Sequence, residues 1–125
     1  MRGKPRRVLI VDDEEGARES LEIILEEFYE VEAVGDGMSA LTRIREKHFD
    51  VVLLDVNMPE VGGLEVLKQI KEYREAIEVI MVSAADHARE AAISIKTGAF
   101  DYITKPYEPQ EILEVVDKVI RRHAR

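Results

Sequence analysis

Short apolar runs that each lead into a polar side chain are the feature that most limits how this chain can fold. The runs are only four or five residues long and rich in Val and Ile, which is typical of buried strands in a parallel sheet. They occupy residues 8–11, 51–54, 79–82 and 100–104. The side chains that follow are Asp12 and Asp13, Asp55, Ser83 and Lys105. Because ligands of such sheets bind outside the carboxyl ends of the strands, we expect these side chains to meet at one rim.

Stretches with helical spacing of apolar residues follow the strands. They cover residues 17–28, 41–48, 64–70, 88–95 and 112–120, and a further strand is expected at 31–35. Five strand–helix units predict an α/β fold, a doubly wound parallel sheet of five strands with helices on both faces. The flavodoxin-like order 2-1-3-4-5 would place the first and third strands side by side, which brings Asp12, Asp13 and Asp55 together.

Local signals refine these elements. We expect Asp86 to be the N-cap of the fourth helix and Asp36 to be a turn and cap residue instead of a metal ligand. The histidines show no metal-ligand spacing. His48 and His123 are expected to be favourable charges near helix carboxyl ends, and His87 a surface residue just after the site loop.

The length and charge of the chain limit the number of domains and the kinds of partner it can have. The 125 residues suit one domain over 1–125, with basic ends at 1–6 and 121–125. Residues 8–120 hold 11 basic against 26 acidic residues, a net charge of −15, which repels nucleic acid and attracts cations. No apolar stretch approaches the ~18 residues that span a bilayer, so no membrane contact is expected. The absence of Cys agrees with a reducing cytoplasm.

The expected rim has a definite chemistry. Clustered carboxylates raise each other's pKa unless a hard cation neutralises them, and oxygen ligands without His or Cys favour Mg²⁺ or a relative such as Mn²⁺. The metal, Lys105 and Ser83 would form a receptor for a transferring phosphoryl group. Asp55 is the best candidate for the nucleophile because it stands alone at its strand end, whereas Asp12 and Asp13 form a pair.

Four motifs in order carry a family resemblance over essentially the full length. They are Val-Asp-Asp-Glu at 11–14, Leu-Asp-Val-Asn-Met-Pro at 54–59 followed by Gly-Gly at 62–63, Val-Ser-Ala at 82–84, and Gly-Ala-Phe-Asp-Tyr-Ile-Thr-Lys-Pro at 98–106. Together they resemble the bacterial response-regulator receiver domain of the CheY-like family, a part of two-component phosphorelays.

The resemblance implies that Asp55 accepts a phosphoryl group from a phosphohistidine on a sensor histidine kinase or a histidine phosphotransfer protein. Mg²⁺ would be held by Asp13, Asp55 and the backbone carbonyl of Asn57, with Asp12 acting largely through water. Asn57 and Ala85 would flank the path of the water that later hydrolyses the acyl phosphate. The chain would then catalyse only its own phosphorylation and dephosphorylation.

The resemblance also implies a switch. Lys105 would pair with the phosphoryl oxygens, Ser83 would move to hydrogen-bond one of them, and Tyr102 would rotate inward. The face built from the fourth helix, fifth strand and fifth helix would change and control a partner, a homodimer or a fused output domain. The bond between Lys105 and Pro106 resembles the family's cis peptide.

Three other functions compete with this interpretation. A haloacid-dehalogenase-like hydrolase needs a second Asp as general acid, where this chain has Asn57. A calcium loop starting at Asp55 needs Gly sixth and Glu twelfth, where the chain has Glu60 and Val66. A flavodoxin-like nucleotide binder wants a glycine-rich or hydroxyl-rich loop where four acidic residues, 12–15, follow the first strand.

Overall fold

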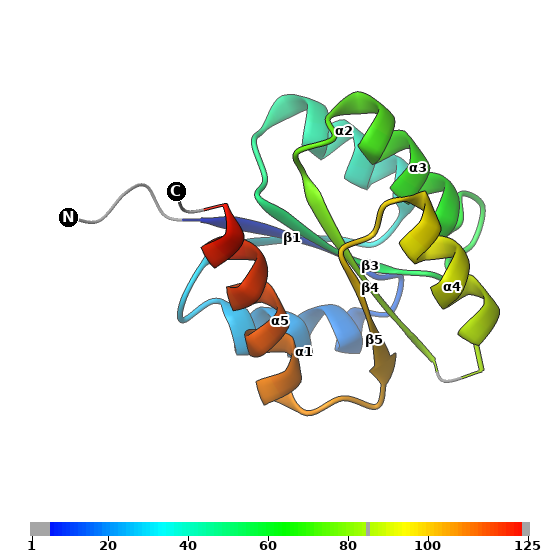
Figure 1. Cartoon of the computed structure of the whole chain (residues 1–125). Helices are drawn as coiled ribbons and strands as arrows, with labels where there is room; N and C mark the ends of the chain where they lie inside the picture. Colours follow the sequence, from blue (N-terminus) through cyan, green and yellow to red (C-terminus); the bar gives the residue numbers. More distant parts are fainter. Residues whose placement is uncertain (1–5, 85, 124–125) are drawn as a thin grey trace.

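Five parallel strands form one sheet with helices packed on both faces (Figure 1). The computed structural model describes residues 6–84 and 86–123. The strand order is β2-β1-β3-β4-β5, which confirms the predicted flavodoxin-like order. The strands are β1 (Arg7–Val11), β2 (Glu30–Val34), β3 (Val51–Asp55), β4 (Glu78–Ala84) and β5 (Asp101–Lys105).

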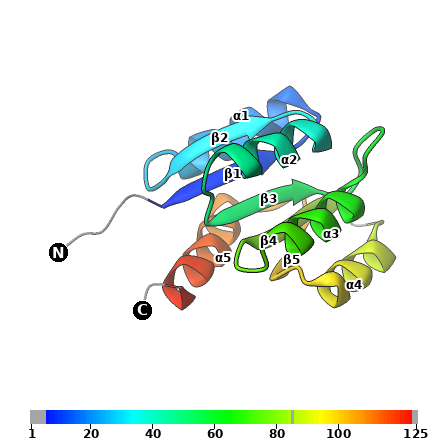
Figure 2. The same ribbon diagram turned by 90° about the horizontal axis from the view of Figure 1, so that it is seen from above.

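The helices form two layers. One layer holds α1 (Glu15–Leu25) and α5 (Pro109–Arg122); the other holds α2 (Gly37–Glu46), α3 (Gly63–Tyr73) and α4 (Ala88–Thr97). Figure 2 shows α2, α3 and α4 following one another along the near face of the sheet. No described helix combines the length and apolar character that crossing a bilayer requires.

Strand β3 is buried throughout and divides the core in two. Val52 and Leu54 contact the apolar cluster under α2 and α3, whereas Val51 and Leu53 contact the cluster under α1 and α5. Successive side chains of a strand point to opposite faces, so both faces must be covered for this sequence to be stable. The central position of β3 places Asp55, its last residue, in the middle of the carboxyl edge.

Three predicted helical stretches differ in the structure. The second was expected to reach His48, but α2 ends at Glu46 and His48 is exposed. The first helix ends at Leu25, and Phe28, expected on its buried stripe, is 59% exposed. In α4 the predicted stripe included Ile95, but Ile95 is 48% exposed and Ser94 is the fully buried residue. Burial of Ser94 is tolerated because its hydroxyl donates to the carbonyl oxygen of Glu90 at 2.7 Å.

Of the two helix caps predicted from the sequence, one is confirmed and one is wrong. Asp36 is the N-cap of α2, and its side chain accepts from the Ser39 backbone N–H at 2.7 Å, as predicted. The N-cap of α4 is His87 and not Asp86, because the helix begins one residue later than expected. Of the basic ends, residues 1–5 and 124–125 lie outside the described residues, and Arg121 belongs to the last turn of α5.

Candidate functional site

Four of the five polar residues predicted to meet line one hollow at the carboxyl edge of the sheet; the fifth, Asp12, is buried and is not among the lining residues. Its walls come from the loops after β1, β3 and β4 and from the end of β5. The lining residues are Asp13, Glu14, Asp55, Asn57, Ser83, Ala84, His87 and Lys105. Ala85, which the family resemblance placed beside the water path, lies outside the described residues.

Three carboxylates converge in this site. Asp12, Asp13 and Asp55 each offer an oxygen, and these oxygens lie within 4.8 Å of one another. Asp12 and Asp55 are buried, whereas Asp13 is exposed. The grouping arises because β1 and β3 are adjacent, with Val11 opposite Leu54 in the register. An all-oxygen, strongly negative donor set of this kind fits a hard divalent cation such as Mg²⁺.

Backbone contacts hold the loop after β3 in place. The Asn57 N–H donates to Oδ1 of Asp55 at 3.2 Å, and the Gly63 N–H donates to the Val56 carbonyl at 2.9 Å. A Cβ on Gly63 would overlap the Asp55 carbonyl oxygen and lie 2.7 Å from Cα of Val56. Only glycine therefore allows α3 to begin this close to the end of β3.

Lys105 supplies a positive charge to the site. Its Nζ lies 3.1 Å from Oδ2 of Asp12 and 3.8 Å from Oδ2 of Asp55. Burial alone would lower the pKa of Lys105, but Asp55 and Asp12 outweigh that effect and raise it. The lysine is therefore charged throughout the physiological range. The peptide bond from Lys105 to Pro106 is cis.

The environment of Asp55 disfavours its charge. Burial is the main cause of a raised pKa, and the nearby Asp12 carboxylate adds to it. The Asn57 N–H and the Lys105 ammonium act in the opposite direction, as does Ser83, without cancelling the rise. A divalent cation would remove this penalty, which is the second sign that the site suits a metal.

The two residues predicted to switch are joined through a histidine. Ser83, at the end of β4, is buried, and its hydroxyl lies 2.9 Å from Nδ1 of His87. Tyr102 on β5 donates its hydroxyl proton to the His87 carbonyl oxygen at 3.3 Å. The expectation that His87 is a plain surface residue is therefore wrong: 24% of its side chain is exposed, and it lines the site. No spacing in the sequence signals this contact, because Ser83 lies in a strand and His87 precedes a helix.

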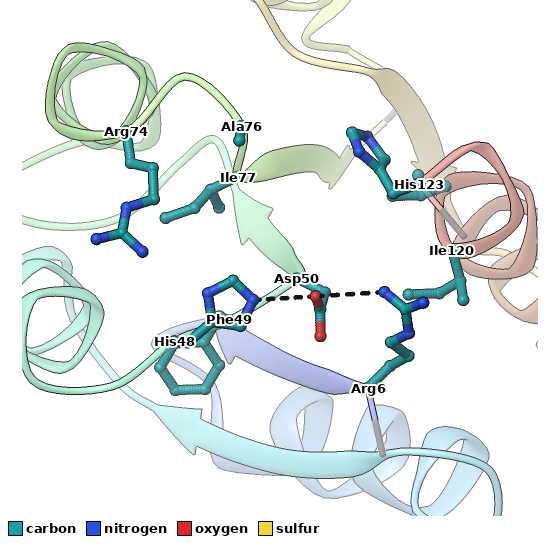
Figure 3. Close-up of a pocket in the computed structure, with 10 residues that line it drawn as sticks. Arg6, His48, Phe49, Asp50, Arg74, Ala76, Ile77, Ile120 and His123 are labelled. Atoms are coloured by element: carbon teal, nitrogen blue, oxygen red, sulfur yellow. Dashed lines mark hydrogen bonds and ion pairs between the residues drawn. The ribbon is translucent and has the colours of Figure 1, made fainter. Parts of the chain in front are cut away.

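A second hollow lies at the opposite, amino end of the sheet (Figure 3). At its centre the Asp50 carboxylate accepts from the Arg7 backbone N–H at 2.9 Å, lies 3.1 Å from Nε2 of His48 and pairs with Arg6 at 3.7 Å. His123 lines the same hollow and pairs with Glu78 at 2.8 Å. His48 thus contacts an acidic residue just before β3, and His123 contacts the first residue of β4, so these contacts join separate segments of the chain.

Comparisons with known proteins point to one family. The family model described as "Response regulator receiver domain" matches residues 8–117. The sensory transduction protein RegX3 of Mycolicibacterium smegmatis is 41% identical over 118 residues, 94% of this chain and 51% of that protein. The chain therefore spans about half the length of the curated relatives it matches.

Solved structures agree with the sequence comparisons. A CheY-like response regulator receiver domain protein from Methanospirillum hungatei superposes with a TM-score of 0.91 at 32% identity, covering 95% of this chain and 96% of that one. The BeF3-activated DrrB receiver domain gives a TM-score of 0.87 at 28% identity, covering 94% and 99%.

Proposed function

The chain belongs to the response-regulator receiver family, and from this membership we propose that Asp55 accepts a phosphoryl group from a phosphohistidine of a partner kinase or phosphotransfer protein. The observation that carries the proposal is the position of Asp55. It is the carboxylate that ends the central strand, lies within 4.8 Å of two others and faces the Lys105 ammonium at 3.8 Å.

The proposed reaction is a transfer between two protein side chains. An Asp55 oxygen bonds to phosphorus as the N–P bond of the phosphohistidine breaks, and the released imidazole nitrogen keeps the electron pair. Asp13, Asp55 and the carbonyl oxygen of Asn57 would hold Mg²⁺, or Mn²⁺ in its place, with Asp12 acting through water. The metal, when bound, neutralises charge on the phosphoryl oxygens. The Lys105 ammonium, 3.8 Å from Asp55, would attract the same oxygens.

Water then hydrolyses the acyl phosphate on Asp55. In this proposal the chain acts only on its own aspartate, and external phosphate esters are not its substrates. The rival hydrolase needs a general acid two residues after the nucleophile, and Asn57 at that position holds no acidic proton. Its side chain is exposed at the rim of the site, and its backbone N–H is used to hold Asp55. The comparisons point to receivers and give the hydrolase no support.

The proposed output is a shift in the face formed by α4, β5 and α5. Ser83, Tyr102 and Lys105 lie at or near this face, and they are the groups that a new phosphoryl charge would attract or displace. The partner would be a fused output domain, for which relatives of about twice this length leave room, or a second copy of the chain. A cytoplasmic location suits a kinase partner of this type.

Phosphorylation by acetyl phosphate with Mg²⁺ tests the proposal directly. The product is trapped by borohydride reduction and mapped by mass spectrometry, with Asp55→Asn as the matched control. We expect one label, on Asp55 in the wild type, and none in the variant. A label on Asp12 or Asp13 while Asp55 is intact would overturn the assignment.

A further inference from the structure

His87 contacts both residues of the proposed switch, although nothing in the family motifs assigns it a role. Its ring nitrogen Nδ1 lies 2.9 Å from the Ser83 hydroxyl, and its carbonyl oxygen accepts from the Tyr102 hydroxyl at 3.3 Å. The same residue is the N-cap of α4. One residue therefore joins the end of β4, the first half of β5 and the start of α4.

The hydroxyl of Ser83 has one proton to donate. With the ring proton on Nε2, Nδ1 of His87 accepts this proton from Ser83 at 2.9 Å. A phosphoryl oxygen on Asp55 is also an acceptor. Ser83 cannot donate its single proton to both, so the bond to His87 must break before the bond to the phosphoryl group forms.

We propose that His87 is a positioning residue that holds Ser83 in the resting arrangement and transmits its release to Tyr102 and α4. The proposal rests on the proposed function, since it assumes a phosphoryl group on Asp55. When Ser83 turns to that group, the His87 ring loses its contact with β4. The His87 carbonyl still accepts from the Tyr102 hydroxyl at 3.3 Å and from the Ala91 N–H of α4 at 3.0 Å, so the start of α4 and the Tyr102 hydroxyl can move together. The His87 N–H still donates to the Ala84 carbonyl at 3.2 Å.

The ring and the backbone of His87 can be tested separately. His87→Ala removes the ring acceptor and keeps the carbonyl that Tyr102 uses. His87→Asn is the matched control, because its side-chain oxygen can occupy the place of Nδ1 and accept from Ser83. Ser83→Ala and the double variant Ser83→Ala/His87→Ala complete a thermodynamic cycle.

The measurement is the affinity for beryllofluoride with Mg²⁺, followed by amide chemical shifts of Tyr102 and α4. Loss of one hydrogen bond specific to the resting state should tighten binding in His87→Ala by about three- to tenfold. Its resting shifts should move toward the bound positions. His87→Asn should behave as wild type, and His87→Ala should have no effect when Ser83 is already Ala.

Two results would overturn the proposal: unchanged affinity and shifts in folded His87→Ala, or an equal gain in the Ser83→Ala background. Thermal unfolding of each variant establishes that it is folded. Labelling with acetyl phosphate distinguishes failure of the role proposed for His87 from failure of the proposed function. If Asp55 is labelled but His87→Ala binds beryllofluoride as wild type does, only the role of His87 is wrong; if wild-type Asp55 is never labelled, the proposed function itself fails.

Discussion

Lys105 donates to Asp12 at 3.1 Å and stands 3.8 Å from the proposed acceptor, Asp55. The lysine is thus engaged by the carboxylate beside the acceptor while remaining close enough to turn to a phosphoryl group. This arrangement keeps a positive charge at the reacting position in the absence of phosphate. It also means that the ammonium has to leave Asp12, at least in part, when it pairs with the phosphoryl oxygens.

Lys105→Met should slow phosphoryl uptake from acetyl phosphate by about 100-fold, because a cation aimed at the transferring oxygens is lost. Mg²⁺ binding should persist, since the competing positive charge is gone while the carboxylates remain. Lys68→Met, on the exposed side of α3, is the control and should react at the wild-type rate. The measurement is the initial rate of acyl phosphate formation in each variant. Equal rates in Lys105→Met and Lys68→Met would contradict the role given to Lys105.

Asp55→Asn should stabilise the metal-free protein at pH 7 by about 1 kcal/mol. The folded pKa of Asp55 is raised, chiefly by burial, so the ionised carboxylate destabilises the fold once the pH exceeds the ordinary Asp range. Below that range the group is protonated in the folded and unfolded states, and the advantage of Asn should disappear. Saturating Mg²⁺ should reverse the order by stabilising the wild type. Urea unfolding at several pH values, with and without Mg²⁺, measures both effects.

Mg²⁺ affinity should fall more in Asp13→Asn than in Asp12→Asn. The Asp12 carboxylate already accepts from Lys105 and from the Glu14 backbone N–H at 3.0 Å, whereas Asp13 projects from the exposed rim. Loss of a direct ligand should weaken binding by at least about tenfold, the lower bound for changes in outer ligands. Calorimetric titration with Mg²⁺ measures the affinity of each variant. Undiminished affinity in Asp13→Asn would exclude Asp13 as a ligand.

Backbone amides of α4 should exchange with solvent at least about tenfold faster than those of α3. The reason is their unequal anchoring: α3 buries Val66, Leu67 and Ile70, whereas Ser94 is the one fully buried residue of α4. Hydrogen exchange followed by NMR tests this expectation in the unphosphorylated protein. Equal protection of the two helices would mean that α4 is not the easily displaced element proposed above.

Asp50→Ala should lower the free energy of unfolding by about 1–3 kcal/mol, because it leaves the Arg7 backbone N–H without its acceptor and removes the partner of His48. Asp50→Asn should lose less, since its carboxamide oxygen can still accept from that N–H. Chemical unfolding measures the difference. Phosphorylation of Asp55 should remain at the wild-type rate in both variants.

The sequence predicts the sheet and most of the site for one physical reason. Parallel strands with apolar residues on both faces must be covered by helices on both faces, and their carboxyl ends, with the polar residues there, share one edge of the sheet. The face of α4 could not be predicted in this way. The buried face of α4 depends on the hydrogen bond that the Ser94 hydroxyl donates to the Glu90 carbonyl within the helix. With its hydroxyl bonded in this way, Ser94 can face the core while Ile93 and Ile95 stay exposed.

The contact of His87 was hidden for a related reason. It depends on where β4 ends and α4 begins, which places the ring 2.9 Å from the Ser83 hydroxyl. Apolar periodicity sets helix boundaries only loosely, and His87 itself carries no periodic signal. The contacts of Asp50 were hidden because they join chain segments far apart in the sequence.

Strand β3 separates the two acidic centres of the molecule, with Asp50 just before its first residue and Asp55 as its last. Five residues of strand span roughly 17 Å. At physiological ionic strength the Debye length is about 8 Å, so added charge on Asp55 is largely screened at the hollow lined by Arg6, His48 and His123. Any response to phosphorylation at that end of α5 must therefore travel through displaced packing and should be nearly independent of salt concentration, whereas binding of the phosphoryl donor at the acidic edge should vary strongly with it.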